Sequence, residues 1–270
     1  MIKLRDDEFK AITSYIQLNY GVDLRKKRHL IEGRLSNHIF QLNYDNYMDY
    51  FEYAKADKKN NEMVVLINKL TTNHTYFLRE NDHFEYYKKT LLPWVDNTLK
   101  SSDLRVWSAG CSSGQEPYTL AMITRDYLTN KHKTWDSTIL ASDISDKVLL
   151  TAKAGIYSNE ELLKIPDEWK KKYFVTHDDE NWIISDFLRK GVAYRNFNLL
   201  SKFQFKKPFH AIFCRNVMIY FDLPTKNDIV QKFYDALLPG GYFFIGQSES
   251  LSSCDHPFKY VKPSVYQKEA

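Results

Sequence analysis

The spacing of apolar residues divides the chain into two parts. Up to Leu70, apolar positions recur at helical spacing in a stretch without proline, and this period predicts a set of helices. After residue 100, short apolar runs typical of strands alternate with helical patterns, which predicts a parallel sheet with crossover helices. The strand-like runs are Leu104–Ala109, Ser137–Ser142, His210–Cys214 and Tyr242–Gly246, and the clearest helical stretches are Glu116–Leu128 and Asp146–Ala154.

These patterns predict a helical domain over residues 1–72 and an α/β domain over residues 73–270, whose first segment, 73–90, is a linker motif. One stretch breaks the alternation of the second part: Tyr173–Val175 and Trp182–Ile184 are strand-like and flank a short polar turn, which predicts an antiparallel hairpin. Val192–Phe197 could supply a further strand. We therefore expect a small antiparallel β insertion at about residues 173–197.

Positive charge is concentrated in the helical part. The chain of 270 residues carries 38 Lys and Arg against 34 Asp and Glu, a formal charge of +4. Apolar residues at helical spacing predict a helix from about Leu24 to Ile39, and most of the excess charge lies along it. Such a charged face is either solvated or a docking surface for an acidic partner. Its basic residues are Arg25, Lys26, Lys27, Arg28 and Arg34.

Composition excludes several classes of protein. With 43% hydrophobic residues, the chain has enough apolar surface for a core and does not resemble a disordered protein. Met1–Lys10 is charged, and no window approaches the roughly 18 apolar residues of a membrane span, so we expect neither a secretory signal nor membrane insertion. The three cysteines are far apart and form no CxxC pair, which excludes a disulfide framework and a thiolate metal site and favours the cytoplasm.

The most informative segment is a strand, a turn and a helix between Leu104 and Met122. Gly110 and Gly114 would allow the backbone of the turn to approach a ligand, and the helix start offers free N–H groups. The segment lacks a full GxGxxG motif and carries an acid, Glu116, which suits a cationic ligand such as an amino group or a sulfonium better than a pyrophosphate. A purely structural turn is the alternative.

A second acid stands at a strand end. The strand-like run before Asp143 would place this carboxylate at the carboxyl edge of the sheet, where it could accept both hydroxyls of a ribose. The alternative is that Asp143 caps the following helix.

Together these elements resemble the S-adenosylmethionine-dependent methyltransferases, and more narrowly the chemotaxis receptor methyltransferases (CheR). The resemblance spans nearly the whole chain in the family's order, and the Cys-Arg-Asn-Val-Met-Ile-Tyr-Phe run is its most specific part. The motifs are Thr71–Glu80, Trp107–Met122, Ala141–Ile144, Ala154–Tyr157, Phe197–Leu200, Ile212–Asp222 and Gly246–Ser250.

The resemblance implies a Rossmann-like methyltransferase domain that binds S-adenosylmethionine and yields S-adenosylhomocysteine. It places Arg79 and Tyr220 beside the transferring methyl group, although a salt bridge from Arg79 to Glu80 or Glu85 and a half-buried Tyr220 are the alternatives. The cofactor contacts that it implies are Asn73, Thr75, Arg79, Gly110, Glu116, Asp143, Asn198, Leu199, Arg215 and Asn216, with Asn198 and Leu199 at the adenine.

The implied activity is protein-glutamate O-methylation of bacterial chemoreceptors, whose helical, glutamate-rich cytoplasmic domains would meet the basic helix. A methyltransferase acting on nucleic acid and a non-catalytic adenosyl-binding scaffold are the alternatives. The resemblance further implies a monomer. We expect no nucleic-acid partner, because Arg215–Tyr220 stands where base amino-methyltransferases carry an Asn/Asp-Pro-Pro-Tyr/Phe motif and the basic run is short for a surface that follows phosphates. Some family members bind a receptor pentapeptide through a longer, glycine-containing hairpin loop, whereas the turn here, Thr176–Asn181, is short and acidic, so we do not expect that tether.

Overall fold

The computed structural model describes residues 2–57, 61–71, 74–98 and 102–269. The first part is helical, as predicted, and its apolar stripe is buried: Ile31, Leu35 and Ile39 belong to a core that the helices share. The helices are α1 (Asp6–Tyr20), α2 (Arg28–Gln41), α3 (Tyr47–Ala56) and α4 (Asn61–Leu70).

The basic helix starts about one turn later than the sequence predicts. α2 begins at Arg28, and the preceding residues form a turn in which the Lys27 amide donates to the Leu24 carbonyl (2.9 Å). Leu24 is nevertheless buried. The prediction of a helix from Leu24 is wrong, because a buried Leu24 satisfies the apolar period of α2 although its backbone belongs to the turn before the helix.

A continuous helical stretch follows the helical domain. α5 (Asn81–Tyr86) passes through a π-helical segment, η1 (Tyr87–Leu91), into α6 (Leu92–Thr98). Pro93 has no N–H to donate within this stretch, so the regular helical ladder is interrupted next to the π-helical segment.

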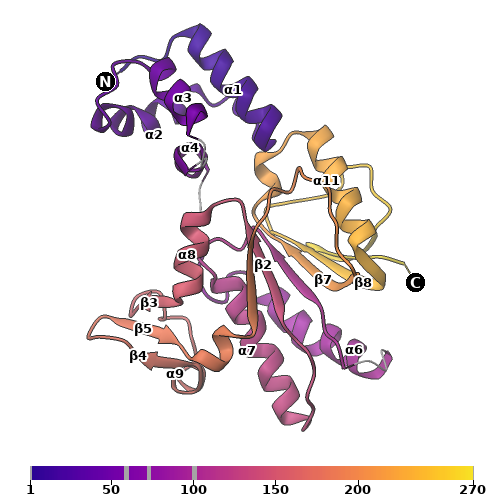
Figure 1. Ribbon diagram of the computed structural model, residues 1–270. Helices are drawn as coiled ribbons and strands as arrows, with labels where there is room; N and C mark the ends of the chain where they lie inside the picture. The colour runs from indigo at the N-terminus through magenta and orange to yellow at the C-terminus, as the bar shows by residue number, and fades with distance from the viewer. Residues whose placement is uncertain (1, 58–60, 72–73, 99–101, 270) are drawn as a thin grey trace.

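The second part is built on a mixed sheet of seven strands in the order β6-β2-β1-β7-β8-β10-β9 (Figure 1). β6, β2, β1, β7 and β8 are parallel, and β10 pairs antiparallel with both β8 and β9. This confirms the predicted α/β fold. The strands are β1 (Val106–Ala109), β2 (Ile139–Asp143), β6 (Val192–Asn196), β7 (Phe209–Cys214), β8 (Leu237–Ile245), β9 (Lys259–Lys262) and β10 (Val265–Gln267).

The two faces of this sheet carry separate cores. Neighbouring residues of β1 point to opposite faces, so Val106 packs with α5 to α8 and Trp107 with α11. Besides α5 and α6, the helices packed on the two faces are α7 (Gln115–Asn130), α8 (Asp146–Ala154), α10 (Asp186–Arg189) and α11 (Leu223–Ala236). Because β1 lies between β2 and β7, its carboxyl end is the point where the strand order reverses, the usual ligand site of such folds.

The predicted hairpin is present, but the small sheet contains a different third strand from the one expected. β4 (Phe174–Thr176) pairs antiparallel with β5 (Asn181–Ile184), and the third strand is β3 (Ile156–Ser158), which precedes α9 (Asp167–Tyr173). β6, expected as part of the insertion, lies instead in the main sheet beside β2. An apolar alternation predicts a strand but does not say which neighbour it pairs with.

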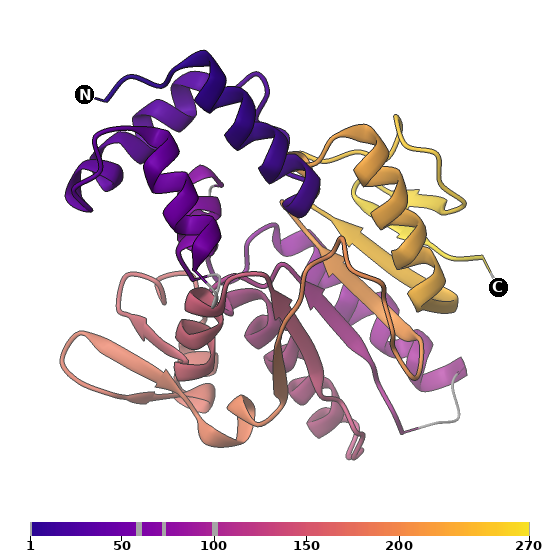
Figure 2. The ribbon, with the colours of Figure 1, turned by 45° about the horizontal axis from the view of Figure 1, so that its top comes forward.

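The helical domain lies across the carboxyl ends of the main strands (Figure 2). Both ribbon views place the end of α1 next to the start of α11, and a β-bridge joins Val22 to Phe221 there. Within the described ranges, no helix is both long and apolar enough to cross a membrane.

Candidate active site

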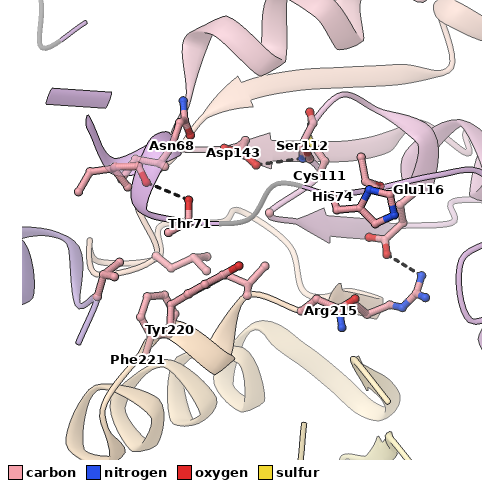
Figure 3. Close-up of a pocket in the computed structure, with 18 of the residues that line it drawn as sticks. Asn68, Thr71, His74, Cys111, Ser112, Glu116, Asp143, Arg215, Tyr220 and Phe221 are labelled. Atoms are coloured by element: carbon pink, nitrogen blue, oxygen red, sulfur yellow. Dashed lines mark hydrogen bonds and ion pairs between the residues drawn. The ribbon is translucent and has the colours of Figure 1, made fainter. Parts of the chain in front are cut away.

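A pocket opens between the carboxyl ends of β1, β2 and β7 and the helical domain (Figure 3). The structure brings together most of the residues that the sequence singled out, from segments far apart in the chain. Those that line the pocket are Thr75, Arg79, Gly110, Glu116, Asp143, Leu199, Arg215, Asn216 and Tyr220. Asn73, also expected there, lies outside the described residues.

The glycine loop after β1 forms the floor of the pocket. Gly110 has φ +81°, and a Cβ atom added there would lie 2.4 Å from Cγ2 of Val217, so no other residue fits without a shift. The amides of Gly110 and Cys111 donate to the Ser142 carbonyl at the end of β2 (2.8 and 2.9 Å). Burial raises the pKa of the Cys111 thiol well above its ordinary value, which favours a packing role over that of a nucleophile.

Asp143 holds the neighbouring loops in place from the end of β2. One carboxylate oxygen accepts from the Ser112 amide (2.9 Å), drawn in Figure 3, and the other accepts from the Ser145 amide (3.0 Å). Ser145 itself caps α8, so the helix-cap alternative for Asp143 gives way to a role in tying the two loops together. Burial raises the pKa of Asp143 against the effect of these backbone donors.

A buried ion cluster forms the wall opposite Asp143. The Arg215 guanidinium lies between two carboxylates, with Nη1 2.8 Å from Oε2 of Glu116 and Nη2 3.1 Å from Oε2 of Glu80. Ser108 donates to the second oxygen of Glu116 (2.6 Å). Burial alone would raise the pKa of Glu80, but the Arg215 charge and hydrogen bonds outweigh it and lower the value.

Glu80 is a site residue whose role the sequence did not reveal. Besides Arg215, its carboxylate accepts from the Gln247 amide (3.1 Å) and from Nδ2 of Asn216 (3.3 Å), so it joins the linker to the ends of β7 and β8. Glu80 has φ +55°, a conformation that is uncommon outside glycine. The only signal was its place in the linker motif, where it was considered as a partner of Arg79.

Glu249 fixes the turn that follows β7 through hydrogen bonds to backbone amides. Its half-buried carboxylate accepts from the amides of Asn216 (2.9 Å), Gly246 (2.6 Å) and Ile219 (3.1 Å). Burial raises the pKa of Glu249, and the backbone donors oppose this rise. The turn leads directly to Tyr220, which lies across the pocket from Asp143 in Figure 3.

Arg79 is positioned by the linker and is not bound to the acids considered for it. Its Nη1 donates to the His74 carbonyl (2.5 Å), whereas Glu80 pairs with Arg215 and Glu85 with Lys89. The guanidinium of Arg79 therefore remains at the pocket with further donors.

The helical domain supplies a third wall, which the sequence did not predict. Tyr20, Val22, Ile67, Asn68 and Thr71 all line the pocket. Nδ2 of Asn68 donates to the Ser145 hydroxyl (2.7 Å) and so links α4 to the start of α8. Apart from Thr71, which begins the motif Thr71–Glu80, these residues belong to no motif that the sequence singled out, because their role depends on how the two domains dock.

One predicted contact is not brought into the pocket. Oδ1 of Asn198 accepts from the Leu200 amide (2.9 Å), and its Nδ2 donates to the Asn19 carbonyl of the helical domain (3.2 Å). Its neighbours Phe197 and Leu199 line the pocket instead.

The basic residues fall into two groups. Arg25 forms two hydrogen bonds with Asp23, which lower the pKa of that acid to about 2, and Arg28 bonds to Asp6 (2.5 Å) and to the Leu4 carbonyl (2.8 Å). Arg34 is exposed, and its Nη1 donates to the Lys69 carbonyl (3.2 Å). The remaining two, Lys26 and Lys27, are exposed to solvent in the turn before α2.

Comparisons with known proteins agree with this geometry. Residues 73–267 match the family "CheR methyltransferase, SAM binding domain", and residues 7–71 match "CheR methyltransferase, all-alpha domain". The chain is 37% identical to a chemotaxis protein methyltransferase of Borreliella burgdorferi over 272 residues, which cover 99% of this chain and 96% of the relative. It is 35% identical to a chemotaxis protein methyltransferase of Escherichia coli, with coverage of 98% and 92%.

Proposed function

Because the chain belongs to the CheR methyltransferase family, we propose that it methylates glutamate side chains of bacterial chemoreceptors in the adaptation of chemotaxis. It is a methyltransferase, and its cofactor is S-adenosylmethionine. The products of the proposed reaction are a glutamate methyl ester and S-adenosylhomocysteine. The observation that carries the proposal is the pocket at the switch point of the sheet, where a glycine loop and the carboxylates Glu116 and Asp143 converge.

The residues of the pocket fit this cofactor. A carboxylate at Glu116 suits an ammonium group, and Asp143 stands at the strand end where hydroxyls are usually bound. The absence of a side chain at Gly110 lets Val217 pack directly against the backbone of the loop, and both residues line the pocket beside the proposed cofactor position. Ile144 and Leu199 add apolar walls, and Thr75, Arg215 and Asn216 add polar groups that we propose as further contacts.

The proposed chemistry requires positioning more than proton transfer. When bound, S-adenosylmethionine supplies the methyl group on a sulfonium. A glutamate carboxylate has an ordinary pKa of about 4.3 and is ionised at neutral pH, so no general base is needed. We assign Arg79 to orient this carboxylate through charge-assisted hydrogen bonds and Tyr220 to support the same geometry. The turnover number should therefore stay nearly constant between about pH 6 and 9, and loss of turnover on removing a single base would contradict this mechanism.

The partner surface is proposed on the helical domain. Of the five basic residues that the sequence offered, we propose the exposed Lys26, Lys27 and Arg34 as contacts to an acidic receptor helix. Arg25 is exposed as well but pairs with Asp23 and lies 3.8 Å from Asp222 of the other domain, and Arg28 pairs with Asp6. We propose a monomer that acts in the cytoplasm on receptor cytoplasmic domains, does not insert into the membrane and does not act on nucleic acid. The Asp178 carboxylate closes the β4–β5 turn by accepting from the Glu180 and Asn181 amides, and the absence of pentapeptide tethering stays a prediction.

The test is transfer of labelled methyl groups from S-adenosylmethionine. The purified protein is incubated with chemoreceptor membranes, with the same receptors carrying glutamine at the methylated positions, and with RNA or DNA. Base-labile label on the glutamate receptors alone is expected, because carboxyl methyl esters hydrolyse readily. Label on nucleic acid, or no label on any substrate, would overturn the proposal.

Two arginine variants provide the control. Arg79→Ala should lower receptor methylation by about 100-fold, since the carboxylate loses its orienting group. Arg125→Ala removes an exposed arginine from α7 and should leave the rate unchanged. Equal rates for the two variants would remove Arg79 from the mechanism.

A further inference from the structure

The connection between α1 and α2 contacts the segment that carries Tyr220. Val22 forms an antiparallel bridge with Phe221, and the Asp23 amide donates to the carbonyl of Tyr220 itself (2.8 Å). These contacts join the residues that follow α1 in the helical domain to a loop of the other domain. The backbone of Tyr220 is therefore held from outside its own domain.

Side chains reinforce this bridge on the far side of Tyr220. Nε2 of Gln17, from α1, donates to Oδ2 of Asp222 (2.5 Å), and the Arg25 guanidinium lies 3.8 Å from the same oxygen. The other oxygen of Asp222 accepts from the Thr225 amide (3.1 Å) and caps α11. Asp222 thus ties the helical domain to both the Tyr220 segment and α11.

The turn at the end of α1 is built to fit against this surface. Gly21 has φ +71°, and an added Cβ atom would lie 3.0 Å from Cγ2 of Thr225 and 3.1 Å from Cδ1 of Phe221. The residues on either side of it, Tyr20 and Val22, line the pocket. Tyr20 and Val22 of the connection therefore face the pocket, whereas Gly21 packs against Thr225 at the start of α11.

The Tyr220 segment is fixed at both of its ends. Glu249 holds its beginning through the amides of Asn216 and Ile219, and the α1–α2 connection holds its end. Tyr220 lies between these two attachments in a single 3-10 turn, Met218–Tyr220, which is too short to be rigid without them.

We propose that the α1–α2 connection is a positioning element for Tyr220, with Gln17 and Asp222 as its positioning residues. The helical domain then has a role in the methyl-transfer step in addition to meeting the receptor. This inference rests on the proposed function, because Tyr220 is assigned to the reacting carboxylate there. A small displacement of the segment would misplace the hydroxyl and lower turnover without removing any cofactor contact.

The test exchanges donor and acceptor between the two positioning residues. Gln17→Glu sets a second carboxylate against Asp222, and the repulsion should open the bridge. Asp222→Asn keeps an oxygen for the Thr225 amide and offers an N–H₂ group to Glu at position 17. Receptor methylation, the affinity for S-adenosylhomocysteine and amide hydrogen exchange of residues 216–222 are measured for both single variants and for the double variant.

The Gln17→Glu variant should lower kcat by about 10- to 100-fold. Its affinity for S-adenosylhomocysteine should remain within about twofold of the wild type, and exchange in the segment should become faster. The double variant should recover most of the lost turnover and protection, since the coupling is specific to the pair. Lys10→Gln makes the same change of net charge at an exposed position of α1 away from Asp222 and should behave like the wild type.

Two results would overturn the proposal. One is an unchanged kcat and unchanged hydrogen exchange in Gln17→Glu. The other is a general structural defect in Gln17→Glu, seen either as a loss of turnover that the double variant does not restore or as a parallel loss of turnover and of cofactor affinity. A wild-type protein that methylates no receptor would instead contradict the proposed function, and hydrogen exchange would still decide whether the connection holds the Tyr220 segment.

Discussion

The glycine loop after β1 and the connection between α1 and α2 both reach the pocket, but different kinds of contact hold them. The glycine loop is fixed by its own strand and by the end of β2, through backbone hydrogen bonds to Ser142. The connection is fixed by a partner surface about 200 residues further along the chain, through Tyr220, Phe221 and Asp222. We propose the first loop for the binding of the cofactor and the second for positioning a residue in the reaction.

This difference predicts separable defects, and the largest is expected at the glycine loop. In Gly110→Ala, the new Cβ would lie 2.4 Å from Val217 in a conformation, φ +81°, that alanine adopts only with strain. The affinity for S-adenosylhomocysteine should fall by at least about 100-fold, or roughly 3 kcal/mol, in a calorimetric titration. A folded variant, checked by its thermal unfolding, that binds with wild-type affinity would show that the backbone does not approach the ligand there.

The matching change in the other loop should have a smaller and different effect. Gly21→Ala also places alanine in a left-handed conformation, φ +71°, but the new Cβ would lie 3.0 and 3.1 Å from its neighbours instead of 2.4 Å, so these side chains need to move less. We expect kcat for receptor methylation to fall by about tenfold while the affinity for S-adenosylhomocysteine changes by less than about threefold. Loss of affinity and turnover in equal measure would remove the distinction between the two loops.

The solvent side of the same connection carries the lysines proposed to meet the receptor. Reversing both charges, in Lys26→Glu/Lys27→Glu, should lower kcat/KM for receptor methylation by about three- to tenfold at low salt, because electrostatic attraction speeds association. The difference should shrink at high ionic strength, and cofactor affinity should not change. The control reverses two exposed lysines elsewhere, Lys131 and Lys206. If both pairs behaved alike, the turn before α2 would be a solvated surface.

The smallest effect is expected where a glycine has no tertiary contact. Gly33 lies within α2, and an added Cβ would meet nothing within 4 Å. Gly33→Ala should raise the free energy of unfolding by about 0.5–1 kcal/mol, as for a glycine in the interior of a helix, without changing methylation. Urea unfolding measures the change, and a destabilised variant would mean that α2 is packed more tightly than its contacts indicate.

Much of the fold could be predicted because its signals are local. The period of apolar residues predicted the helical domain and the alternating strands and helices, and α8 occupies the predicted residues, Asp146–Ala154. The β4–β5 hairpin was also predicted, because a polar turn between two apolar runs is a short-range pattern. The start of α2 and the partner of β6 were not, since Leu24 and the β6 residues satisfy a period that several arrangements share.

The candidate site shows the same limit. The strand-end residues Gly110, Glu116 and Asp143 could be proposed from the sequence, because a parallel sheet brings the carboxyl ends of its strands to one edge. Their hydrogen-bond partners could not. Glu116 was expected to face a cationic ligand, and the structure adds that it is paired with Arg215.

The sequence by itself determined the two-domain organisation, the α/β fold, the glycine loop and the family. The first three depend on the spacing of residues within one or two neighbouring elements, which apolar periodicity and strand ends record directly. The family follows from the resemblance of motifs between Thr71 and Ser250, taken in their order along the chain. Only the tertiary structure decided which charges of the basic segment face solvent, which acid pairs with Arg215, and that the helical domain lines the pocket beside Tyr220. Those outcomes depend on how the surfaces of two separately packed domains dock. A contact between segments far apart in the chain produces no repeating pattern of apolar residues in the sequence of either segment, so the sequence does not reveal it.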